Sequence, residues 1–171
     1  SLGLIMGTQV MTAISYGARQ MLDCGFAWRR GAPYAVAIGL IFAFVSLFSD
    51  QMLRTLGLSE DLAIHGGEIA SISGYSLPFV LLFLVSASFL EGIKRPMPGV
   101  IMILIANLVN VALNWIMIYG NMGAPVMGAA GAVWATNTCR FLLAITIIFY
   151  ILNMRDHEIF GLRRKLAHSW S

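Results

Sequence analysis

Apolar residues occur in long, nearly uncharged blocks along this chain, and short polar stretches separate the blocks. The block at residues 32–49 carries no charge and, at 1.5 Å per residue, reaches about 27 Å, close to the hydrocarbon thickness of a bilayer. Five such blocks predict membrane-spanning helices, at residues 1–18, 32–49, 62–90, 98–119 and 128–152. The predicted fold class is therefore an all-α transmembrane bundle of about five spans at residues 1–152.

Composition agrees with this pattern. Hydrophobic residues make up 58% of the chain and charged residues 11%, against about 45–50% and 25% in average soluble domains. The net charge of +3 is spread between apolar blocks, so no nucleic-acid partner is expected. Cys24 and Cys139 show no metal or redox spacing, and no nucleophile or phosphate-loop motif is present, so we expect no enzyme, no metal and no cofactor.

Basic residues predict the orientation of the bundle, because short cytoplasmic loops carry an excess of Lys and Arg. The connections after the first and third spans, together with the tail at residues 153–171, hold nine such residues, and the other side holds Arg54 alone. The tail is therefore predicted to be cytoplasmic, and its mixture of basic and apolar residues suits an interfacial segment. Ser1 opens the chain within an apolar block, which predicts a fragment with a further span before it. The nine residues are Arg19, Arg29, Arg30, Lys94, Arg95, Arg155, Arg163, Arg164 and Lys165.

Pro78 lies near the middle of the long third block. Proline lacks an N–H group and its ring clashes with the preceding turn, so we expect a kink in this span. Neighbouring helices would then have to satisfy the freed backbone groups.

A polar stripe runs down the fourth span, where Asn107, Asn110 and Asn114 share one helical face. Two interpretations stay open for this stripe. The amides either join helices by hydrogen bonds, or they line a path for an ion or a polar substrate.

Glu68 and Arg140 are the ionisable residues furthest inside apolar blocks. Both are predicted toward the outer ends of their spans. They either form an ion pair between the third and fifth spans or reach separately to the interface. The functional alternative is a proton or cation relay.

The stretch from Leu90 to Arg140 resembles the multidrug and toxic compound extrusion (MATE) transporters. The part of the chain before this stretch resembles them as well. The similarity rests on short motifs spread along the chain. They are Tyr16-Gly17-Ala18-Arg19, Arg29-Arg30-Gly31, Glu91-Gly92, Asn110-x-x-x-Asn114-Trp115, Tyr119-Gly120, Gly123-Ala124-Pro125, Gly128-x-x-Gly131 and Ala135-Thr136.

The resemblance implies twelve helices in two six-helix lobes, with this chain as spans two to six of the N-terminal lobe and the first span and C-terminal lobe missing. It implies exchange of Na⁺ or H⁺ for organic cations and drugs by alternating access, in the inner membrane of a bacterium. In the NorM-like branch the matching cation-site positions are Asn110 and Asn114, with backbone oxygen near Gly128. Another branch has a carboxylate where Asn114 stands and a hydroxyl where Ala132 stands, which leaves the coupling ion open.

Two other functions stay open from the sequence. One is a lipid-intermediate flippase of a related helical fold. The other is a non-transporting membrane scaffold or complex subunit, in which the polar residues would only join helices.

Overall fold

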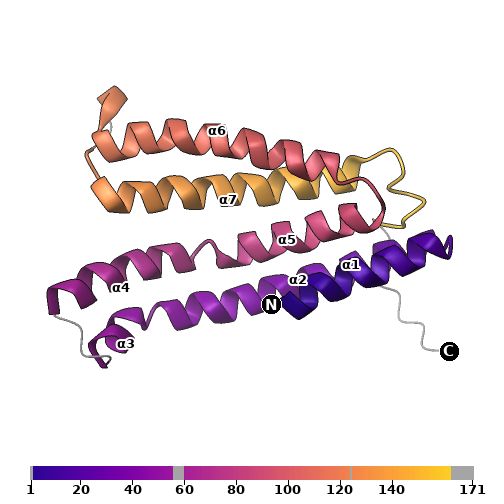
Figure 1. The fold of residues 1–171 in the computed structure, drawn as a ribbon, viewed down its shortest axis with the longest axis horizontal. Helices are drawn as coiled ribbons and strands as arrows, with labels where there is room; N and C mark the ends of the chain where they lie inside the picture. Colours follow the sequence, from indigo (N-terminus) through magenta and orange to yellow (C-terminus); the bar gives the residue numbers. More distant parts are fainter. Residues whose placement is uncertain (1, 56–59, 124, 163–171) are drawn as a thin grey trace.

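The computed structural model describes residues 2–55, 60–123 and 125–162, and it is helical with no strand in these ranges. Helices α6 and α7 lie side by side as one layer, α4 and α5 follow each other in the next, and α1, α2 and α3 lie beyond them (Figure 1). The elements are α1 (Leu2–Gly17), α2 (Met21–Ser46), α3 (Ser49–Thr55), α4 (Glu60–Gly74), α5 (Leu77–Gly92), α6 (Met97–Tyr119), a 3₁₀ turn (Asn121–Gly123) and α7 (Gly128–Asn153).

Helix α5 is the centre of the bundle, because it packs against α1, α2 and α7. Its side chains Val85, Phe89 and Leu90 are fully buried. Helix α6 packs mainly on α7, and most of its apolar side chains stay exposed. Such an apolar outer surface matches a lipid environment better than water.

Two helices in the described part of the chain, α6 and α7, are long and apolar enough to cross a membrane. The pair α4 and α5 forms a third candidate if the two helices count as one bent span. Helix α1 has 16 residues, fewer than the roughly 20 that a bilayer requires. The all-helical fold is confirmed, and the number of five spans stays a prediction.

The kink expected at Pro78 is confirmed. Helices α4 and α5 meet at an angle of 46°, and Pro78 is the second residue of α5. At the break the amide of Ser76 donates to Ser73 instead of Ile72, four residues back. Asn137 of α7 replaces the lost bond by donating its Nδ2 to the Ile72 carbonyl at 2.6 Å. A neighbouring helix thus supplies a hydrogen bond to a backbone carbonyl that is freed at the break. The membrane core requires this, because it offers no water as a partner.

Helix α2 begins before the second predicted span, and the start of that span at residue 32 stays a prediction. Helix α2 begins at Met21, so Asp23, Arg29 and Arg30 lie within a helix and not in a polar connection. Arginine favours helices about as well as leucine, and the Arg30 guanidinium lies 4.3 Å from the centre of the Phe26 ring. Polar residues therefore extend the helix past the end of the apolar block.

The polar stretch after the second block also differs from its prediction as a loop. Helix α3 occupies Ser49–Thr55, and the Ser49 hydroxyl contacts the carbonyl of Gly67 in α4 at 3.0 Å. This bond holds the short helix against α4.

Residues 154–162, which we call the clasp, fold back onto the bundle after α7. Phe160 and Leu162 are buried, and the rings of Phe89 and Phe160 meet edge to face with centroids 6.0 Å apart. Asp156 pairs with Arg95 of the α5–α6 connection at 2.7 Å. The beginning of the predicted interfacial tail therefore packs against protein, while Arg163, Arg164 and Lys165 lie outside the described residues.

We expect the Arg95–Asp156 pair to make a small, measurable contribution to the clasp. Reversing one charge, as in R95D, should lower the free energy of unfolding by about 0.5–1 kcal/mol, because the pair is partly exposed. The double reversal R95D/D156R should recover much of that loss in a thermal melt. The matched control is R155D at the exposed neighbouring position. If the double variant is no more stable than R95D, the pair does not stabilise the clasp.

Candidate functional site

Asn110 and Asn114 of α6 form a hydrogen-bonded pair that extends to α7. Asn114 donates its Nδ2 to Oδ1 of Asn110 at 3.0 Å, as the spacing of four residues in a helix allows. Asn110 donates a longer bond, 3.4 Å, to the hydroxyl of Thr136. Thr136 donates in turn to the carbonyl of Ala132 at 2.9 Å. We call Asn110, Asn114 and Thr136 the amide site.

The Oδ1 atom of Asn114 is buried and has no hydrogen-bond partner among the described residues. A buried acceptor left without a donor costs about 1–3 kcal/mol. A cation or a hydrogen-bond donor placed beside this oxygen would remove that cost. The amide site therefore presents an acceptor, which favours a positively charged or hydrogen-donating ligand.

A close approach of α6 and α7 makes the amide site. An added Cβ at Gly131 would lie 2.7 Å from the carbonyl oxygen of Met117, so only glycine fits there without a shift. The amide of Met127 donates to the same carbonyl at 3.1 Å. These contacts set the register in which Asn110 meets Thr136.

The other two predicted members of the site lie apart from this pair. Asn107 shares the helical face but is exposed. Gly128 is the first residue of α7 and has a positive φ of 53°, a backbone conformation that favours glycine. No hydrogen bond connects it to Asn110 or Asn114 within the described ranges. The structure thus brings Asn110 and Asn114 together, and Asn107 and Gly128 lie outside this hydrogen-bonded pair.

The predicted ion pair between Glu68 and Arg140 is not formed among the described side chains. Glu68 is exposed on α4, and Arg140 donates its Nη1 to the Ser76 hydroxyl at 2.8 Å. Arg140 also lies at the midpoint of α7, as residue 13 of 26, and not toward one end. The prediction of an outer position was wrong for Arg140, which contacts Ser76 at the break and not Glu68 among the described side chains.

Sequence reasoning did not assign Thr136, Asn137 or Ser76 to a site. Thr136, Asn137 and Arg140 are polar positions inside the fifth apolar block. Their spacing places Thr136 and Arg140 one turn apart on one face, while Asn137 faces the break between α4 and α5. Polar residues inside an apolar helix are costly, and this signal could have identified Thr136 and Asn137.

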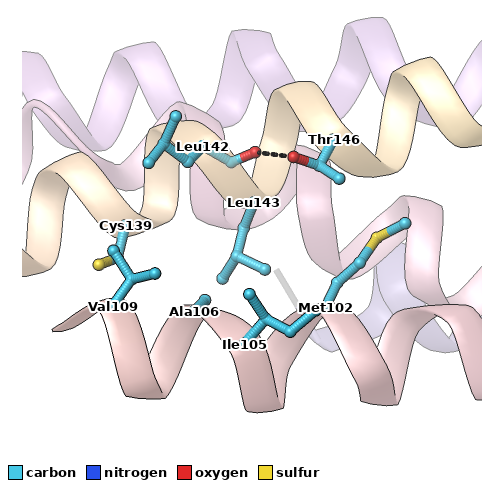
Figure 2. Close-up of a pocket in the computed structure, with 8 residues that line it drawn as sticks. All are labelled: Met102, Ile105, Ala106, Val109, Cys139, Leu142, Leu143 and Thr146. Carbon is cyan, nitrogen blue, oxygen red and sulfur yellow. Dashed lines mark hydrogen bonds between the residues drawn. The ribbon is translucent and has the colours of Figure 1, made fainter. Parts of the chain in front are cut away.

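An apolar groove of about 210 Å³ lies between α6 and α7. Figure 2 shows its side chains projecting from the two helices, with the Thr146 hydroxyl bonded to the Leu142 carbonyl. The groove offers van der Waals contacts and no free polar group in this view. Asn110 and Asn114 do not line it, so it is separate from the amide site. Its lining residues are Met102, Ile105, Ala106, Val109, Cys139, Leu142, Leu143 and Thr146.

Comparison with known proteins gives a family match over most of the chain. The sequence model of the family described as MatE matches residues 1–116. The probable multidrug resistance protein NorM of Caulobacter vibrioides is 34% identical over 168 residues, which cover 98% of this chain and 36% of that protein.

More distant relatives carry related names. The multidrug resistance protein NorM of Vibrio cholerae is 26% identical over 90% of this chain and 34% of its own length. The probable multidrug resistance protein YoeA of Bacillus subtilis is 23% identical over 93% of this chain and 34% of its own length. The chain thus spans about a third of the length of the curated relatives that it matches.

Proposed function

Since this chain belongs to the MatE family, we propose that it forms part of a membrane transporter that exports toxic compounds in exchange for a cation. The exported compounds are small organic cations and drugs, and the coupling ion is Na⁺ or H⁺. Transport proceeds by alternating access, in which this bundle and the rest of the protein move around a shared cavity. The bacterial inner membrane is the proposed location. The names of the relatives, which are multidrug resistance proteins, support the proposal.

The unpartnered Oδ1 of Asn114 is the observation that carries the proposal. Sodium is a hard cation that prefers oxygen ligands, and an amide oxygen held in a buried position is such a ligand. The bond from Asn114 to Asn110 orients that oxygen. A complete coordination shell needs more oxygens than these amides supply, so the rest of the protein contributes the other ligands.

Replacing Asn110 and Asn114 by alanine tests this function in the full-length protein. We expect the double variant N110A/N114A to need at least about tenfold more cation for half-maximal export. The loss of one ligand that contributes about 1.4 kcal/mol to the binding free energy weakens binding tenfold. The measurement is efflux of a cationic dye from proteoliposomes with an imposed Na⁺ gradient, and separately with a pH gradient. The two gradients distinguish the coupling ions.

The matched control is N107A, which removes the exposed amide of the same stripe. It should transport with an unchanged cation dependence. If N110A/N114A behaves like N107A, the amide site does not bind the coupling ion. If the wild-type protein moves no dye but moves a lipid-linked substrate, the flippase alternative replaces the exporter, and no transport of either would favour a scaffold.

A further inference from the structure

The three threonine hydroxyls of α7 all donate back along the helix. Thr136, Thr138 and Thr146 each bond to the carbonyl four residues earlier, at 2.8–2.9 Å. A helical threonine makes this bond in one of its two common rotamers. The carbonyl has no hydrogen to offer, so the hydroxyl is the donor in each bond. The hydrogen of Thr136 is therefore used by the Ala132 carbonyl, and only its lone pairs remain for a neighbouring helix.

This bond decides which way the Asn110 amide faces. The Thr136 oxygen can only accept from α6, so Asn110 turns its Nδ2 toward it, at 3.4 Å. The opposite orientation of the amide would place its oxygen against a hydroxyl oxygen whose hydrogen is already used. To relieve that contact, Thr136 would have to exchange its 2.9 Å bond to Ala132 for a longer one. Because the shorter bond has the better geometry, the orientation with Nδ2 toward α7 is the stable one.

Asn110 passes this orientation on to Asn114. With its Nδ2 facing α7, Asn110 has its Oδ1 left to accept from Nδ2 of Asn114 at 3.0 Å. The Oδ1 of Asn114 is then the end of the chain of bonds, buried and without a hydrogen-bond partner among the described residues. If the chain ran in reverse, this oxygen would accept from Asn110, and Asn114 would present an N–H group instead. The direction of the chain thus decides whether the amide site offers an acceptor or a donor.

We propose that Thr136 is the positioning residue of the amide site. By donating to the Ala132 carbonyl, it fixes the direction of the hydrogen-bond chain, so that Asn114 presents an oxygen to a cation. Amide oxygens are ligands for hard cations, whereas an amide N–H group can only donate. Thr136 acts through the two asparagines, and no contact with the ion is required. The inference rests on the cation site of the proposed function and names the residue that gives that site its preference for cations.

The test is titration of the purified full-length protein with NaCl at alkaline pH, measured by calorimetry. T136V keeps the shape of the side chain and removes the hydroxyl, so the reversed chain becomes accessible and occupies the Asn114 oxygen. It should bind Na⁺ about fivefold more weakly, which is about 1 kcal/mol, the net contribution of the one hydrogen bond that the cation must now break. T136S keeps the hydroxyl and should bind Na⁺ as the wild type does. The matched control is T138V, which removes an exposed hydroxyl with the same kind of backbone bond and should leave the affinity unchanged.

A change at Asn110 separates this role from simple packing. N110D introduces a carboxylate, which when ionised only accepts hydrogen bonds, so it fixes the orientation of Asn114 without help from Thr136. T136V should therefore weaken Na⁺ binding in the wild-type background and not in the N110D background. An equal loss in both backgrounds, unchanged binding in T136V, or an equal loss in T138V would each overturn the role of Thr136.

Failure of the proposed function gives a different pattern of results. If N110A/N114A weakens Na⁺ binding and T136V does not, the cation site stands and only this inference fails. If N110A/N114A binds Na⁺ as the wild type does, or the wild type shows no saturable Na⁺ binding, the sodium site and this inference are both contradicted. Should T136V not fold, T136A removes the same hydroxyl with a smaller side chain, and the same loss is expected of it, with T138A as its control.

Discussion

Replacing Gly25 by alanine should detach the clasp from the bundle and destabilise the protein by about 3 kcal/mol. An added Cβ at Gly25 would lie 1.8 Å from the carbonyl oxygen of Phe160 and 2.9 Å from its carbonyl carbon. Both are backbone atoms, so a side-chain rotation cannot relieve the clash. The clasp would have to move away, and Phe160 and Leu162 would leave their buried positions.

The neighbouring cysteine reports this movement. Cys24 is fully buried in the same apolar cluster as Phe160 and Leu162, and burial raises the pKa of its thiol above the ordinary value. The thiolate is the form that reacts with maleimides, so labelling of Cys24 should be slow in the intact bundle. In a C139A background, with any cysteines outside residues 1–171 replaced, G25A should label much faster than its parent.

Gly7 provides the matched control for this substitution. An added Cβ at Gly7 meets nothing within 4 Å, and alanine favours a helix by up to about 1 kcal/mol over glycine. G7A should therefore be as stable as the parent or slightly more stable, with slow labelling of Cys24. Slow labelling and an unchanged melting temperature in G25A would show that the clasp does not pack on α2.

A second large effect is expected at Gly39, where α2 crosses the broken span. A Cβ there would lie 2.4 Å from Cα and 2.7 Å from the nitrogen of Pro78. We expect G39A to separate α2 from α5 and lower the free energy of unfolding by about 3 kcal/mol. Thermal unfolding of the purified full-length protein measures the loss.

The result for G39A also separates packing from helix propensity. Alanine raises helix propensity at both Gly39 and Gly7, so propensity alone predicts stabilisation of both variants. Close packing against Pro78 predicts a loss for G39A and none for G7A. Equal melting temperatures of G39A and G7A would mean that α2 and α5 do not meet closely at this point.

The sequence predicts the helices of this bundle well because membrane spans are marked by length and apolarity, which are local properties. The kink at Pro78 was predictable for the same reason, since a missing N–H breaks a helix wherever it stands. Helix boundaries were less predictable. The second apolar block begins at Ala32, but helix α2 begins at Met21 because nothing in the Arg29-Arg30 pair terminates a helix.

The partners of polar residues could not be predicted from one sequence. The spacing of Asn110 and Asn114 predicted a shared face, and the structure confirms their contact. Which group Arg140 contacts depends on how α7 is rotated toward α4 and α5, and no local pattern encodes that rotation. The ion pair with Glu68, one of two alternatives for these residues, is not formed among the described side chains, and Ser76 at the break was missed.

The clasp has a consequence for how this bundle can be divided or exchanged with relatives. A chimaera joined directly after Asn153, the last residue of α7, would remove the aromatic ring that meets Phe89 and the backbone that covers Gly25. A junction after Leu162 keeps both contacts and the Arg95–Asp156 pair. The exchangeable unit of this fold therefore extends through Leu162, nine residues past its last helix.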